Sequence, residues 1–466
     1  MNARPNHGIL EFDNNKLPEE PRMLILHSLL SELKDEFVQS RKGEERGAWF
    51  IHTLVAIILP FTSSRTSNLL RTLATLFGFS DIKWKRYYRF MASPKIPWNR
   101  LWPRLWNMIP EPETDDRLIL VLDDYINPKT GKKIFGCAKV FDHAAKQNQS
   151  RYPWAQNIVA IGLLKMIKGR WACLPLSRRY YFLEKDIKKN RPIYKRQAIA
   201  FQTKHRQAVD MLSDVAANFP KSNILVVSDS WFGNDGLWKP LHKELGKRVH
   251  MLSRLRCNSN LFSLPDAPAE KSAGRPRKYG SKLGTASSLA TSKKEQACEY
   301  KVNLYGRERT VSAYDQVVIV KTLKCPIRVV WVYRRSQWVA LFTTDLTLSV
   351  AEIIEYYGAR WKTEAGFKEL KRDIGSAETQ NRHPVAVQNH LDFCMMATSL
   401  TWIYACRLEK TPSRRHAVTG RNHYAFSDVR RLVAKAALDD NFPILCQTPR
   451  KSVVNSLVTA LMRIAA

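Results

Sequence analysis

Residues 349–371, SVAEIIEYYGARWKTEAGFKELK, have the pattern of one continuous amphipathic helix. Ser349 followed by Glu352 forms the S/T-x-x-E capping box of a helix start, no proline interrupts the segment, and Gly375 can end it. At about 100° per residue, one side of this helix should face a core. Its apolar members are Ile353, Ile354, Tyr357 and Trp361.

Charged residues fall on the same side of this predicted helix. Arg360, Glu364 and Lys371 share it, although burying an unpaired charge costs several kcal/mol. Two interpretations stay open. Arg360 and Glu364 can form an ion pair at the favoured i,i+4 spacing, or Glu364 can be a metal ligand flanked by groups that bind phosphate.

The spacing of four residues in this segment resembles a known signature. Tyr357, Arg360, Glu364 and Lys371 match the YREK signature of DDE transposases from bacterial insertion sequences. The resemblance implies an RNase H-like core in which Glu364 is the third carboxylate of a two-metal site. It also implies that Tyr357, Arg360 and Lys371 grip phosphates beside the cut, and that two aspartates lie upstream, each ending a strand.

Composition is that of a basic globular protein with about three domains. The chain has 466 residues, 44% of them hydrophobic, and carries a formal net charge of +33. An excess of this sign and size attracts polyanions, so nucleic acid is the expected partner. A ribosomal protein or a membrane-surface protein is the alternative.

The cysteine pattern indicates a reducing compartment, and the N-terminus indicates a soluble intracellular protein. The eight cysteines contain no CxxC pair, which argues against a zinc site and a disulfide framework. The N-terminus lacks the apolar run of a signal peptide, and the apolar stretch 49–61 is too short to cross a bilayer. We therefore expect a soluble, cytoplasmic, nucleoid-associated bacterial protein with no membrane partner.

Residues 1–115 read as an all-α DNA-binding domain. Helical patterns cover 21–39, 45–59 and a third segment that stops at Gly78. The fourth, SDIKWKRYYRFMA, sets basic residues among aromatic ones, so the last two helices outline a helix-turn-helix. A helical bundle with a solvated basic face is the alternative. We expect DNA contact from Lys85, Arg86 and Arg89.

The run RLILVLDDYI, residues 117–126, is a buried strand that ends in two aspartates. Capping the following turn would explain one aspartate but not both. The resemblance places the first catalytic aspartate at this strand end, so we assign Asp123, with Asp124 as the alternative. Neighbours on a strand point to opposite faces, and the sequence leaves that choice open.

A second strand that ends in a carboxylate follows a predicted helix over 196–219. In NILVVSDSWFG, the apolar run delivers Asp229 to the carboxyl edge of the sheet, where open α/β sheets keep their sites. An aspartate here can also cap the next turn or helix. Together with Asp123 and Glu364 it completes the expected carboxylate set.

Residues 257–345 are expected to be an insertion, because 134 residues separate Asp229 from Glu364. The first part is basic and contains AGRPRKYG, which resembles an AT-hook core that would place Arg275, Arg277 and Lys278 against a minor groove. A flexible basic loop is the alternative. Three β-branched runs between 316 and 345 predict a small antiparallel sheet.

The resemblance also implies a role for a tryptophan of this insertion. Trp331 or Trp338 would stack on a base pulled out of the duplex near the cut, although core packing is an alternative for both. The chain then continues with a helical pattern over 385–406 and two weaker helical segments in the tail.

These patterns predict an α/β chain: an RNase H-like mixed sheet flanked by helices, an inserted β-rich subdomain and an all-α N-terminal domain. The expected domains are 1–115, the catalytic core in two parts over 116–256 and 346–406, the insertion 257–345, and a C-terminal helical region 407–466.

The expected function is cut-and-paste transposition, with cleavage at the ends of a mobile element and strand transfer. Asp123, Asp229 and Glu364 would bind two Mg²⁺ ions, with Mn²⁺ as a substitute, because carboxylate oxygens suit hard cations. The expected partners are double-stranded DNA and further copies of the chain, in a homodimer or higher oligomer. A resolvase-type or repair nuclease, or a non-catalytic DNA-binding protein derived from a transposase, is the alternative.

Overall fold

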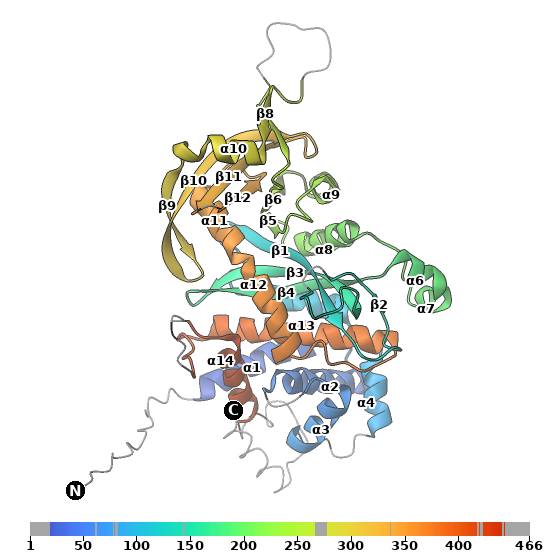
Figure 1. The fold of residues 1–466 in the computed structure, drawn as a ribbon. Coiled ribbons are helices and arrows are strands. Elements are labelled where there is room, and N and C mark those ends of the chain that lie inside the picture. Colours follow the sequence, from blue (N-terminus) through green and yellow to red (C-terminus); the bar gives the residue numbers. More distant parts are fainter. Residues whose placement is uncertain are drawn as a thin grey trace, which may run out of the picture.

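The computed structural model of the chain describes residues 19–442, except 61–62, 78, 80–82, 143–144, 266–276, 336, 417–418, 420–422 and 440–441. It is a mixed α/β structure built on one long sheet (Figure 1). The helices predicted for the end of the tail lie outside the described residues. None of the helices in the described part is long and apolar enough to cross a membrane.

Five strands form the centre of the sheet, in the order β4-β3-β1-β5-β6. Strand β3 is antiparallel to both its neighbours, whereas β1, β5 and β6 are parallel to one another. This mixed sheet with flanking helices is the RNase H-like fold that was expected. The strands are β1 (Arg117–Pro128), β3 (Trp154–Ile167), β4 (Arg170–Tyr181), β5 (Asn223–Ser228) and β6 (Val249–Arg254), and the short β2 (Cys137–Lys139) pairs with β3.

Alternate residues of β1 face two different layers. Ile119 and Val121 share an apolar cluster with Ile353 and Ile354 of α11 (Val350–Ala359), which covers one face of the sheet. Leu118, Leu120 and Leu122 are buried on the other face, the side of α8 (Lys204–Asn218) and α9 (Asp235–Leu245). The apolar run of β1 is therefore continuous because both of its faces are covered.

The insertion extends the central sheet rather than forming a separate one. Strand β12 (Gln337–Thr343) pairs antiparallel with β6, so that the sheet has twelve strands. The expected small sheet is thus fused to the core through backbone hydrogen bonds. The other elements are β7 (Asn260–Phe262), β8 (Lys282–Thr285), α10 (Ala286–Ser292), η2 (Lys294–Gln296), β9 (Cys298–Leu304), β10 (Arg307–Val320) and β11 (Pro326–Arg334).

The N-terminal helices pack on the helix that follows the segment 349–371. Helix α13 (Pro384–Arg407) places Phe393 5.1 Å from Phe50, ring centre to ring centre, and its Asn389 accepts a hydrogen bond from Trp98. The helices of this layer are α1 (Glu19–Lys34), α2 (Arg41–Ile58), α3 (Thr66–Phe77), α4 (Trp84–Met91), α5 (Trp98–Asn107) and α14 (Phe426–Ala437) (Figure 1). The helical pattern over 385–406 is confirmed.

The helix predicted over 196–219 begins later than expected. Ala198 has a positive φ of 52°, and α8 starts only after the N-cap Thr203, whose hydroxyl accepts a hydrogen bond from the amide of Arg206. The preceding residues form the short helices α6 (Glu184–Lys189) and α7 (Arg191–Arg196). A short 3₁₀ turn, η1 (Gly246–Arg248), ends α9.

The segment 349–371 is helical throughout but divided. It forms α11, α12 (Trp361–Lys368) and a π-helical turn, η3 (Glu369–Asp373). The capping box of Ser349 and Glu352 is confirmed by both of its hydrogen bonds, and Gly375 has a positive φ of 86°. The prediction that Trp361 faces the core is wrong, since 52% of it is exposed. The helix is interrupted at Arg360, so the 100° spacing does not carry across.

Candidate active site

Two carboxylates lie side by side where the parallel pairing of β1 with β5 ends. The last pair of that ladder is Leu122 with Ser228, and the next residues on the two strands are Asp123 and Asp229. The Asp123 side chain is only 18% exposed. Burial, and after it the negative charge of Asp229, raises the pKa of Asp123 to about 7. The two carboxylates therefore repel each other and favour a positive charge between them.

The loop after β5 fixes the position of Asp229. Its Oδ1 accepts hydrogen bonds from the amides of Trp231 and Phe232, at 3.0 and 3.2 Å, and its carbonyl accepts one from the Ser253 hydroxyl at 2.7 Å. A Cβ at Gly233 would lie 2.3 Å from the Ser253 oxygen, so the close approach requires glycine. Asp229 is thus held by its own turn, as an Asx-type motif.

Arg360 lies between Asp123 and Glu364. Its Nη1 is 3.4 Å from Asp123 Oδ2, and its Nη2 is 3.6 Å from Glu364 Oε1. The guanidinium carbon lies 5.5 Å from the centre of the Tyr357 ring. The Nε of Arg360 is buried and has no hydrogen-bond partner among the described residues. One cation therefore bridges carboxylates from the strand β1 and the helix α12.

Glu364 is too exposed to be a member of a buried ion pair in the core. Its side chain is 44% exposed. Burial raises the pKa of Glu364, whereas Arg360 lowers it. A pair that is this open to water and 3.6 Å long contributes at most about 0.5 kcal/mol. The ion pair predicted as one alternative exists, but it does not account for the position of Glu364 on energetic grounds.

Asp124 points to the opposite face of the sheet. Its Oδ2 accepts a hydrogen bond of 2.7 Å from Lys204 at the start of α8, and its amide donates one to Asp123 Oδ1 at 2.8 Å. Lys204 also lies 5.4 Å from the centre of the Trp231 ring. Asp124 therefore has its own cation, on the side away from Glu364 and Arg360.

Lys371 lies on the same side of the sheet as Asp123. Its Nζ is 4.8 Å from the centre of the Tyr125 ring, and Tyr125 follows Asp123 by two residues on β1. Phe367 packs against the same ring at 4.3 Å. Burial lowers the pKa of Lys371. The helical segment formed by α12 and η3 therefore places Arg360, Glu364 and Lys371 over the face of β1 that carries Asp123.

The two candidate tryptophans have different surroundings. Trp331 is fully buried, and its indole N–H donates to the carbonyl of Ala286 at 2.9 Å, so it presents no face to a base and the stacking role expected of it is wrong. Trp338 lines a pocket of about 450 Å³ together with Ser230, Arg254 and Arg256. This pocket adjoins Asp229 through Ser230.

The remaining DNA-binding candidates are on the surface where they are described. Lys85, Arg86 and Arg89 of α4 are exposed, and Arg86 pairs with Glu45 at 2.5 Å. Arg277 and Lys278 are also exposed, whereas Arg275 lies outside the described residues. The turn between α3 and α4 includes residues outside the described part, so a helix-turn-helix geometry stays a prediction.

Sequence reasoning missed two cations near the carboxylates, Lys204 and Arg254. Arg254 ends the apolar strand β6 just as Asp229 follows β5, so the same pattern of a polar residue after a buried strand could have found it. Lys204 carries no such signal, because only the packing of α8 brings it to Asp124.

Across the described residues, no three His, Cys, Asp or Glu side chains lie close enough together to hold a metal ion. Glu364 is turned toward Arg360, which separates it from the two aspartates' oxygens. A family model described as "DDE superfamily endonuclease" matches residues 36–317, which include Asp123 and Asp229. A search of curated proteins found no match to the chain.

Proposed function

The chain belongs to the DDE superfamily endonuclease family, and from this premise we propose that it is a DNA transposase that uses Asp123, Asp229 and Glu364. The observation that carries the proposal is the pairing of Asp123 with Asp229 at the end of the β1–β5 ladder, opposite Glu364 and across Arg360. Carboxylates this close, with burial and Asp229 raising the pKa of Asp123 to about 7, need a cation.

The carboxylate oxygens of Asp123, Asp229 and Glu364 are the ligands that Mg²⁺ and Mn²⁺ prefer, and Glu364 would have to turn from Arg360 to join the two aspartates around a metal ion. When bound, two such ions supply an activated oxygen nucleophile and stabilise the leaving oxygen of an in-line phosphodiester displacement. In the structure, the guanidinium of Arg360 lies between two of these carboxylates, 3.4 Å from Asp123 and 3.6 Å from Glu364. In the loaded protein, Arg360 would turn from these carboxylates to a DNA phosphate.

Asp123, rather than Asp124, is the proposed ligand on β1. Asp124 already has a 2.7 Å bond to Lys204 and belongs to the face of α8, whereas Asp123 shares the face of α12 with Glu364. An aspartate that is neutralised by a lysine gains less from a metal than one beside a second carboxylate.

The other predicted residues take part in DNA binding in this proposal. Tyr357, Arg360 and Lys371 would contact phosphates beside the cut, in line with the YREK spacing. Trp338, beside Arg254 and next to Asp229, would stack on an unpaired base at that position. The exposed cations of α4 and of the insertion would bind the duplex in a bacterial nucleoid, with two or more copies of the chain on the DNA.

The test is a cleavage assay on DNA that carries the flanking sequences of the coding region. Mg²⁺ or Mn²⁺ should support cleavage, and EDTA should abolish it while DNA binding persists. Asp123→Asn should abolish cleavage, whereas Asp124→Asn, one residue away, should retain most of it. Cleavage that survives chelation, or that fails only in Asp124→Asn, would contradict the proposed site.

A second readout separates a transposase from a nuclease on the same core. Strand transfer joins the 3′ end of the cut DNA to a target plasmid, which a branched or integrated product reveals on a gel. Metal-dependent cleavage without such a product, under conditions in which the ends are intact and a target is present, would favour the endonuclease alternative.

A further inference from the structure

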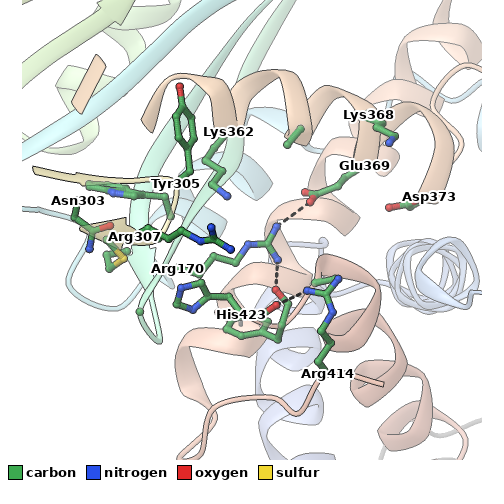
Figure 2. Close-up of a pocket in the computed structure, with 17 residues that line it drawn as sticks. Arg170, Asn303, Tyr305, Arg307, Lys362, Lys368, Glu369, Asp373, Arg414 and His423 are labelled. Carbon is green, nitrogen blue, oxygen red and sulfur yellow. Dashed lines mark hydrogen bonds and ion pairs between the residues drawn. The ribbon is translucent and has the colours of Figure 1, made fainter. Parts of the chain in front are cut away.

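A pocket of about 550 Å³ opens beside α12, where Lys362, Ala365 and Lys368 line it (Figure 2). We call it the α12 groove. Its walls come from four places far apart in the sequence: the turn between β3 and β4, the turn between β9 and β10, α12 with η3, and Arg414 together with residues 423–425. The groove therefore adjoins the helix that carries Glu364 without sharing its carboxylates.

Cations outnumber acids in the groove. Its charged lining residues are Arg170, Arg307, Lys362, Lys368 and Arg414 against Glu369 and Asp373. Burial raises the pKa of Glu369 to about 7, although Arg170 lowers it, so part of this negative charge is lost near neutral pH. The local charge is thus positive and suited to an anion.

Two of the arginines are held in place by the protein. Arg170 donates to the carbonyl of Tyr424 at 2.6 Å and to Glu369 at 3.3 Å, and its guanidinium lies 5.1 Å from the centre of the Trp402 ring. Arg414 donates to the carbonyls of His423 and His416, at 2.6 and 2.8 Å. Preorganised guanidinium groups lose little entropy when they bind a phosphate.

An exposed aromatic side chain stands at the rim. Tyr305 and Gly306 form the two-residue turn between β9 and β10, both with positive φ, and Tyr305 is 55% exposed. The turn packs closely against His423. A Cβ at Gly306 would lie 2.7 Å from a ring nitrogen of His423, so this position requires glycine. The guanidinium carbon of Arg309 lies 5.9 Å from the centre of the Tyr305 ring.

We infer that the α12 groove binds a single DNA strand that leaves the cut, with Tyr305 stacked on a base at the rim and the groove cations on the phosphates behind it. The inference rests on the proposed function. A basic groove that follows the backbone, with an aromatic ring for stacking, is the general design of single-strand sites. A volume of about 550 Å³ holds one or two nucleotides but not a duplex.

Figure 2 shows how the residues are directed: Arg170, Arg307 and Lys362 extend into the pocket from three different walls. Arg307 follows the Tyr305 turn directly at the start of β10 and lines the same pocket as Tyr305.

The test is DNA binding in EDTA, where no cleavage interferes. The probes are a blunt duplex of arbitrary sequence and the same duplex with a single-stranded extension, each labelled with a fluorophore. Tyr305→Ala and Arg307→Ala should each weaken binding to the extended probe about tenfold relative to the blunt one. Tyr305→Phe should keep the affinity, since stacking needs the ring and not the hydroxyl.

Lys247→Ala is the matched control, because Lys247 is an exposed cation of the η1 turn beside α9 and does not line the groove. It should reduce binding to both probes equally and slightly. An equal loss on both probes in Arg307→Ala would assign the groove to duplex DNA and overturn the inference, as would no loss on either. Displacement of the extension by a free mononucleotide at equal concentration would show a nucleotide site instead.

The test of the groove can be separated from the test of the proposed cleavage site. Tyr305→Ala leaves Asp123, Asp229 and Glu364 unchanged, so metal-dependent cleavage of a blunt substrate should persist. Cleavage lost in Asp123→Asn together with unchanged strand binding in Tyr305→Ala would uphold the transposase site and refute the groove.

Discussion

Replacing Asp123 with asparagine should stabilise the metal-free protein at alkaline pH. Burial and the charge of Asp229 raise the pKa of Asp123 from an ordinary 3.8 to about 7. At 1.36 kcal/mol per pKa unit, the ionised carboxylate destabilises the folded chain by up to about 4 kcal/mol above pH 7. The raised pKa already includes the attraction of Arg360, but asparagine can place an amide donor where Oδ2 now faces the Arg360 Nη1 at 3.4 Å, which removes part of the gain, so we expect a net gain of about 2 kcal/mol.

The sign of the pH dependence follows from the raised pKa. Below pH 3.8 the group is protonated in the folded and in the unfolded chain, so it does not affect stability. Between pH 3.8 and 7 only the unfolded chain releases the proton, and stability falls as pH rises. The advantage of Asp123→Asn should therefore be full above pH 7 and vanish near pH 4.

The assay is thermal melting in EDTA from pH 4 to 9. With an unfolding entropy of about 2.1 cal/mol/K per residue, a chain of 466 residues gains about 2 °C for 2 kcal/mol. Asp124→Asn is the control on the same strand: it breaks the 2.7 Å bond to Lys204 and should lose about 1 to 2 kcal/mol. An Asp123→Asn protein that melts lower than the parent at pH 8, or gains as much at pH 5, would refute the reasoning.

Three further predictions concern the same site and its DNA. Glu364→Gln should change the free energy of unfolding by less than about 0.5 kcal/mol in a denaturant titration, because the ion pair of Glu364 with Arg360 is 3.6 Å long and the Glu364 side chain is 44% exposed. The same variant should lose metal-dependent cleavage. A loss of several kcal/mol in stability with cleavage intact would show that Glu364 has a structural role. DNA affinity, measured by fluorescence anisotropy, should fall at least 10-fold between about 50 and 200 mM salt, because each neutralised phosphate releases counterions; a flat response would contradict DNA binding. Lys371→Ala should weaken binding of DNA ends and leave Mg²⁺ affinity by calorimetry unchanged, and a loss of both would place Lys371 in the metal site.

The pattern of the chain was enough to predict the fold class and most secondary structure around the carboxylates. The apolar run before Asp229 is β5, and the capping box at Ser349 starts α11. The run before Asp123 is only the first half of β1, which continues through both aspartates to Pro128, so the prediction that this strand ends at them is wrong. These features are local, since period, capping and turn residues act between neighbours in the sequence. The break at Arg360 was not predicted, although Gly358, two residues before it, is a weak helix former that could have indicated it.

Tertiary structure decided what local patterns left open. Asp123 and Asp124 are neighbours in the sequence, but the pairing of β1 with β5 brings Asp229 beside Asp123, and the packing of α8 brings Lys204 to Asp124. Trp331 and Trp338 stand on neighbouring strands, and only the helix over Trp331 buries it. The α12 groove is lined by four segments that lie between Met166 and Ala425 in the sequence, and no local signal relates them. Sequence sets the face that a side chain takes on its own element, but which element covers that face depends on contacts between residues far apart in the chain.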